Sequence, residues 1–138
     1  AFDLEDFFKQ HKAAFQFVYS EDKYYFSHAG ITQKFFEIIK GFKSMYNFNG
    51  KINFITESNE GNTIMGTAGP KRGGLRGDVP SCIWADKEEL LSDFAIEFTK
   101  NNIIQVVGHT PQRYHTITRN CIFVDCKGKN IKPLILEI

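Results

Sequence analysis

Two short apolar runs that lie far apart in the chain each lead into a histidine, and they constrain the fold more than any other feature. "KYYFSH" (23–28) is aromatic and "IIQVVGHT" (103–110) is β-branched, and both compositions are typical of strands. The first run ends at His28, and the second ends on a turn that contains His109. Ligand sites in open α/β sheets lie at the carboxyl ends of strands. The pattern therefore predicts an α/β fold whose two strand-terminal histidines could meet at one sheet edge.

The other elements follow from the spacing of apolar residues. Helical spacing predicts amphipathic helices, and short β-branched or aromatic runs predict strands. Helices are expected over residues 3–18, 32–46 and 85–102, and Asp3 and Thr32 are the expected N-caps of the first two. Further strands are expected over 114–118, 121–125 and 133–138, and a hairpin turn at "CKGKN" is expected to join the last two.

Residues 47–82 differ from the rest of the chain. They are rich in glycine, have no sustained period, and contain the basic segment "KRGGLRG" (71–77). Long irregular segments inside compact domains are often functional. We expect a long loop region on the substrate side of the fold, with one short helix or strand at most.

Composition limits the class of protein. The 138 residues have the usual size of one domain, 42% of them are hydrophobic, and the net charge is +1. The mixed charges give no electrostatic case for nucleic acid or an anionic membrane surface, and no apolar run approaches the length of a membrane span. The amino end does not resemble a signal peptide, and three cysteines are too few for a disulfide scaffold, so we expect a cytoplasmic protein with reduced thiols.

The residues alone leave two interpretations of the histidines open. Two neutral imidazoles that converge at a sheet edge suit a borderline metal such as zinc, iron or manganese. The same two side chains could instead form a structural pair, which the weak signal from spacing alone favours. Spacing along the chain does not decide between metal ligation and a structural role.

Five short motifs add a family resemblance. "SHAGI", "RGG", "CIWADKEELL", "VVGHTPQ" and "IFVDC", in this order, resemble the second half of the calcineurin-like metallophosphoesterases, closest to the bacterial and phage protein-phosphatase-like branch. The resemblance covers nearly the whole chain. It implies the second half of a four-layer αββα sandwich. It also implies two divalent metal ions (Mn, Fe or Zn) whose bridging hydroxide attacks the phosphorus of a phosphate ester.

The resemblance assigns roles residue by residue. His28, in the His-Ala-Gly turn, and His109, in the Gly-His-Thr turn, match two ligands of the same metal ion. Arg72, in "KRGG", best fits the position of the arginine that binds the substrate phosphate and acts in catalysis, and Arg76 is the alternative for substrate binding. A guanidinium matches the oxygens of a phosphate, and glycines allow close approach of the backbone.

Three further residues have mainly structural interpretations. Asp125 matches an aspartate of the family's closing strand, and we expect it to support the site without binding metal. Asp86 is expected to cap the helix that follows it. Trp84 is expected to pack, rather than to stack on substrate.

The family's amino-terminal half has no match in this chain. Its Asp-x-His, Gly-Asp-x-x-Asp-Arg-Gly and Gly-Asn-His motifs carry the bridging aspartate, most of the first metal site and the general acid. Two histidines cannot complete a two-metal site, because each metal needs about four to six ligands. Three interpretations follow: a fragment of a longer enzyme, one half of a split enzyme whose partner chain supplies the rest, or a degenerate module that binds without catalysis.

Overall fold

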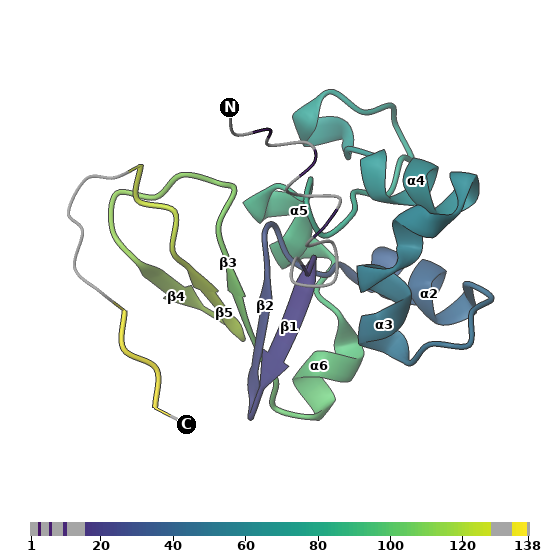
Figure 1. The fold of residues 1–138 in the computed structure, drawn as a ribbon. Coiled ribbons are helices and arrows are strands. Elements are labelled where there is room, and N and C mark those ends of the chain that lie inside the picture. The colour runs from purple at the N-terminus through teal and green to yellow at the C-terminus, as the bar shows by residue number, and fades with distance from the viewer. Residues whose placement is uncertain (1–2, 4–5, 7–9, 11–15, 128–133, 138) are drawn as a thin grey trace.

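One mixed β-sheet organises the molecule. The computed structural model describes residues 3, 6, 10, 16–127 and 134–137. In this part of the chain the strand order is β1-β2-β3-β5-β4 (Figure 1). β2, β3 and β5 are parallel at the centre, and β1 and β4 are antiparallel edge strands. The strands are β1 (Val18–Glu21), β2 (Tyr24–Ser27), β3 (Ile104–Val107), β4 (Thr116–Thr118) and β5 (Cys121–Phe123). The chain is thus a mixed α/β protein with a five-stranded mixed sheet.

Side chains alternate between the two faces of this sheet, as strand geometry requires. Tyr25 faces the main core, which β2 shares with the helices on the right of Figure 1. Val107 and Phe123 pack with Leu90 in a second cluster. The opposite face presents a third cluster of buried residues: Tyr24, Val106 and Ile122. Both faces are therefore apolar, which fits a sheet with layers on both sides.

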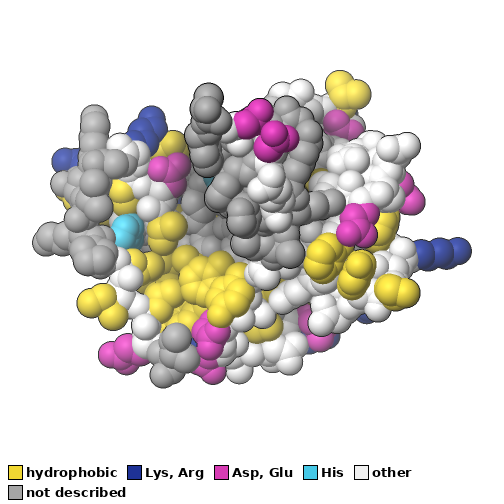
Figure 2. Space-filling view, in the orientation of Figure 1, with side chains coloured by type: hydrophobic (Ala, Val, Ile, Leu, Met, Phe, Trp, Pro, Cys, Tyr) yellow, Lys and Arg dark blue, Asp and Glu magenta, His cyan; other side chains and the backbone are white. Residues whose placement is uncertain are grey.

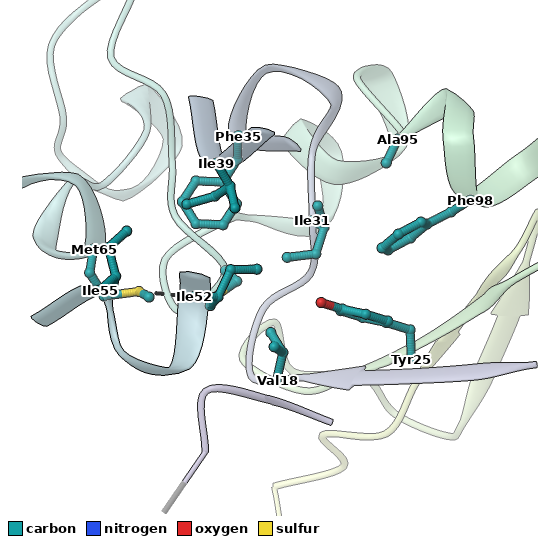
Figure 3. Packing of buried hydrophobic residues seen from close by; sticks show 11 residues of the cluster. Val18, Tyr25, Ile31, Phe35, Ile39, Ile52, Ile55, Met65, Ala95 and Phe98 are labelled. Carbon is teal, nitrogen blue, oxygen red and sulfur yellow. Dashed lines mark hydrogen bonds between the residues drawn. The ribbon is translucent and has the colours of Figure 1, made fainter. Parts of the chain in front are cut away.

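Two helices and the first strands enclose the main core. α2 (Gln33–Gly41) buries Phe35 and Ile39, and α3 (Phe48–Asn53) buries Ile52. Figure 3 shows these side chains converging on Tyr25 and Val18. Thr32 is the N-cap of α2, as predicted, and its hydroxyl accepts a hydrogen bond from Phe35 N. Such caps and buried faces make a nine-residue helix stable in its context.

The prediction for residues 47–82 is wrong, because this segment is largely helical. It contains α3, the 3₁₀ turn η2 (Ile55–Glu57), α4 (Asn59–Gly66) and the 3₁₀ turn η3 (Pro70–Arg72). Side chains of Asn47 and Ser58 cap α3 and α4. Each helix buries only one or two residues, so the apolar period is too short to detect. Gly61 allows α4 to pack closely against Ile55, because a Cβ at this position would lie 1.8 Å from the carbonyl oxygen of Ile55.

Several predicted boundaries are also wrong. The helix expected over 32–46 ends at Gly41, and Met45 is 94% exposed instead of buried. The helix expected over 85–102 is two helices, α5 (Lys87–Ser92) and α6 (Ile96–Lys100). Between them, Phe94 forms an isolated β-bridge with Thr32. Tertiary pairing therefore interrupts the helical period at this point.

The predictions for the two ends of the chain hold only in part. The predicted helix over 3–18 lies mostly outside the described residues, but it does not reach Val18, which begins β1. Asp3 Oδ1 accepts from Asp6 N at 3.1 Å, the bond expected of the predicted N-cap. Residues 134–137 are not in a strand, so that part of the strand expected over 133–138 is wrong. The "CKGKN" turn lies partly outside the described residues.

Candidate functional site

The histidines that follow β2 and β3 meet at one edge of the sheet. The two strands are parallel neighbours, with Ser27 opposite Val107. Just beyond this pair, Gly108 N donates a hydrogen bond to His28 O at 2.8 Å. His28 Nε2 then lies 2.8 Å from His109 Nδ1, although 81 residues separate them in the sequence. The predicted convergence at the carboxyl ends of the strands is confirmed.

Buried contacts fix the turn that carries His28. Ala29 N donates to Cys82 O at 2.7 Å. Gly30 has a φ of +105°, and a Cβ there would lie 2.5 Å from a methyl group of Leu90. Both the left-handed backbone and the lack of space require glycine. The histidine is thus held on a turn whose backbone tolerates little change.

His109 has an unusual backbone and an imidazole whose pKa is lowered. Its φ is +64°, in the left-handed region that costs energy for residues other than glycine and is often found at functional sites. The Trp84 ring meets the imidazole edge-on at 6.0 Å between centroids. Burial lowers the pKa of His109 below its usual 6.5, and the neighbouring Arg72 and His28 lower it further, against the opposing effect of Asp86 and Asp125. A neutral imidazole is the form that binds metal ions.

Arg72 lies beside the histidine pair, at the end of η3. Its Nη2 contacts Asp86 Oδ2 at 3.0 Å and Thr110 Oγ1 at 3.2 Å. Thr110 directly follows His109, so this hydrogen bond connects the guanidinium to the turn that carries His109. Arg76, four residues on, is exposed, with no ion pair to a described residue. Of the two arginines suggested by the sequence, the structure therefore brings Arg72 to the histidines.

Asp125 lies two residues beyond β5, at the same edge of the sheet. Its backbone oxygen accepts from Gln112 N at 2.6 Å, and its carboxylate accepts from Lys127 N at 3.0 Å. Its charge raises the pKa of His109, in opposition to burial. Its carboxylate therefore binds its own turn and acts on the imidazole through charge. Asp86 is the N-cap of α5, as predicted, and Trp84 is 38% exposed.

Two buried nitrogen atoms of the site have no hydrogen-bond partner. Among the described residues, the buried side-chain nitrogen and oxygen atoms without a partner are Arg72 Nε and His109 Nε2. Buried polar atoms are nearly always paired, and exceptions often point to an ion, a water molecule or a catalytic role. Both exceptions belong to residues that the sequence had already singled out.

The facing imidazoles are suited to one metal ion. Two nitrogens bound about 2.0–2.1 Å from the same ion lie roughly 3 Å apart at a right angle and roughly 3.3 Å apart at the tetrahedral angle that zinc prefers. The separation of 2.8 Å is slightly shorter than the first distance, and it also suits a direct hydrogen bond between two imidazoles. In the described part of the chain, no group of three or more His, Cys, Asp or Glu side chains could hold a metal ion. The chain therefore offers two converging ligands, and other groups would have to supply the rest.

No family model, curated protein or solved structure matches this chain. No helix within the described residues is long and apolar enough to cross a membrane. The geometry of the site therefore carries the functional conclusion.

The sequence did not reveal two residues that shape this site, Gln105 and Thr110. Gln105 is fully buried, and its amide group binds both the N–H and the C=O of Ile31, at 2.6 and 3.0 Å. A lone polar residue in the apolar run "IIQVV" was its only signal. The bond from Arg72 to Asp86 joins residues 14 positions apart, and Thr110 joins both segments. No spacing rule connects such positions.

Proposed function

We propose that this chain supplies part of the active site of a phosphoesterase that depends on two metal ions. Its contribution is one pair of metal ligands, His28 and His109, and one phosphate-binding group, Arg72. The observation that carries the proposal is the 2.8 Å approach of the two imidazole nitrogens next to buried, unpaired nitrogens of Arg72 and His109. The resemblance of the sequence motifs points to the same three residues.

The residues of the chain fit the chemistry of this reaction. Bound metal ions would supply Lewis acidity and a hydroxide nucleophile to a phosphate ester. The facing nitrogens of His28 and His109 would hold one such ion as neutral ligands. Arg72 would bind the phosphate oxygens and stabilise the negative charge that spreads over them during transfer. The remaining metal ligands and the proton donor to the leaving group would come from outside these 138 residues, in the same or another chain.

The apolar face of the sheet that carries Tyr24, Val106 and Ile122 supports a larger assembly. A cavity of about 390 Å³ lies against this face, and its lining includes Phe26, Val106 and Val124 and, at one end, His28. Figure 2 shows hydrophobic side chains gathered over this region. Such a patch is typical of a surface that packs against another element. We infer that a second sheet covers it, which would complete the αββα sandwich and bring further ligands next to His28.

A binding module without catalysis is the second candidate. The observation in its favour is that no third metal ligand joins the two histidines among the described residues. In this case His28 and His109 form a hydrogen-bonded pair, and the basic site retains only affinity for phosphate groups. The two candidates differ in whether the protein, in its complete form, hydrolyses a phosphate ester.

Hydrolysis of p-nitrophenyl phosphate with added Mn²⁺ tests the proposal. The complete protein, with any segment or partner encoded next to these residues, should turn over the substrate. His28→Ala and His109→Ala should each abolish turnover, whereas His115→Ala, outside the pair, should retain it. Turnover that survives either of the first two changes would contradict the ligand assignment. A metal-loaded but inactive complete protein would favour the binding module.

A further inference from the structure

We propose that Asp86 is the positioning residue of the phosphate-binding arginine. Its carboxylate holds the guanidinium of Arg72 beside the histidine pair before any ligand arrives. This inference rests on the proposed function, which assigns phosphate binding to Arg72. It adds a residue whose only expected role was to cap a helix.

The two carboxylate oxygens of Asp86 bind different partners. Oδ1 accepts a hydrogen bond from Glu88 N at 3.0 Å, which caps α5. Oδ2 lies 3.0 Å from Arg72 Nη2, and the two side chains are 18% and 28% exposed. A partly buried ion pair is screened by solvent less than a surface pair. The helix cap thus fixes the carboxylate, and the carboxylate fixes the arginine.

A second set of bonds fixes the backbone of the turn that carries Arg72. Glu89 Oε1 accepts from Lys71 N at 2.9 Å, and Glu89 Oε2 accepts from Asp86 N at 2.9 Å. Gly69 makes this approach possible, because a Cβ there would lie 2.3 Å from Glu89 Oε1. The start of α5 therefore holds both the backbone and the side chain of the turn, and the guanidinium has little freedom to move.

Thr110 connects this arrangement to the histidines. Its Oγ1 accepts from Arg72 Nη2 at 3.2 Å and from Lys87 N at 3.0 Å. The hydroxyl therefore joins the arginine, the start of α5 and the turn that carries His109. Groups that are held in place before binding lose less conformational entropy when the ligand arrives.

Asp86 does not saturate the guanidinium. An arginine has five N–H donors, and the contacts to Asp86 and Thr110 both use Nη2. Nε is buried and has no partner. The ion pair thus orients the side chain and leaves donors for phosphate oxygens.

Asp86→Asn separates the two roles of the carboxylate. Asparagine caps helices as well as aspartate does, but it lacks the charge that pairs with Arg72. Glu88→Gln is the matched control, because it also removes one negative charge from the first turn of α5. Among the described residues, the ion-pair partner of Glu88 is the exposed Lys71, at 2.7 Å. If Asp86→Asn fails to fold, Asp86→Ser provides a second capping residue without charge.

Two measurements on the full chain read out the position of Arg72. The first is the ¹H–¹⁵N NMR signal of its Nε–H, assigned by its loss in Arg72→Lys. This signal should be sharp and slow to exchange in the wild type and in Glu88→Gln, and broad in Asp86→Asn. The second is the dissociation constant of inorganic phosphate, which should rise several-fold in Asp86→Asn and stay equal or fall slightly in Glu88→Gln.

The outcomes distinguish this inference from the proposed function. An unchanged Arg72 signal in Asp86→Asn, or a phosphate affinity equal to or higher than that of the wild type, would overturn the positioning role. Phosphate that fails to shift the Arg72 signal of the wild-type protein would instead count against phosphate binding by Arg72. The sharpness of the signal would still decide whether Asp86 holds the side chain.

Discussion

At the scale of single residues, Gln105 shows how one buried side chain places the site. Its amide group satisfies both backbone groups of Ile31, three residues after His28. Gln105→Met has a similar size but leaves these groups unpaired, at a cost of about 1–3 kcal/mol for each buried group. We expect urea denaturation to show a loss of stability in this range or above. Gln33→Met is the control, because Gln33 is half-buried and binds one backbone group, Ile96 N; this change should lower stability less. A loss of stability in Gln105→Met that is equal to or smaller than the loss in Gln33→Met would contradict the role of Gln105 in holding Ile31.

The cysteines give a second test at this scale. Burial raises the pKa of Cys82 and Cys121 from 9.0 to about 12, while Cys126 is only partly buried. Because a thiol must ionise to react, a disulfide reagent at pH 8 should modify Cys126 quickly and the other two only after unfolding. Fast modification of all three thiols in the native protein would contradict the described packing.

The raised pKa values of Cys82 and Cys121 also predict how the stability of the protein depends on pH. The native state keeps both buried thiols protonated, whereas the unfolded chain releases these protons near pH 9. The contribution of the two thiols to the free energy of unfolding is therefore complete below pH 9 and is lost as the pH rises toward about 12. Urea denaturation of the wild type and of Cys121→Ala between pH 8 and 11 should show a shallower decline in the variant. Equal slopes would contradict the raised pKa of Cys121.

At the scale of elements, the helices show what periodicity can and cannot predict. β2, β3 and α2 were predicted because each has a concentrated apolar signal and, for α2, a capping threonine. α3 and α4 were missed because they are short and bury few residues. The break between α5 and α6 was missed because a distant partner causes it: Asp93 O accepts from Gln33 N at 2.6 Å, and Asp93 Oδ2 accepts from Lys34 N at 3.0 Å.

The site was predictable to a similar degree. Strand-terminal histidines lie in the two runs with the clearest pattern, so their convergence followed from the parallel sheet. Arg72 was identified from the family resemblance alone, because it lies in a 3₁₀ turn of three residues, which is too short to show an apolar period. The contacts that hold it, to Asp86 and Thr110, depend on the packing of three separate segments, which a single sequence does not encode in any local pattern.

The turn that carries Arg72 yields a prediction at this scale. A Cβ at Gly74 would lie 1.9 Å from the carbonyl oxygen of Ala68. Gly74→Ala should therefore displace the turn and lower the melting temperature by several degrees, as expected for a loss of about 1–3 kcal/mol. Gly66→Ala, in α4 with open space around it, is the control and should be neutral or stabilising. A melting temperature for Gly74→Ala equal to that of the control would contradict the close packing.

At the scale of the whole molecule, the apolar sheet face has consequences for association. If a second sheet normally covers this face, the 138-residue chain alone should self-associate at micromolar concentration. Sedimentation velocity over a range of concentrations would measure this directly. Addition of the segment or partner that completes the sandwich should abolish the self-association. A chain that stays monomeric at all concentrations would count against a second sheet on this face.

The central claim is that His28 and His109 hold one metal ion together. Isothermal titration of the chain with Zn²⁺ tests it most directly. The account predicts one ion bound per chain, loss of this binding in His28→Ala and in His109→Ala, and unchanged binding in His115→Ala. Absence of binding to the wild-type chain, or binding that persists in either of the first two variants, would contradict it.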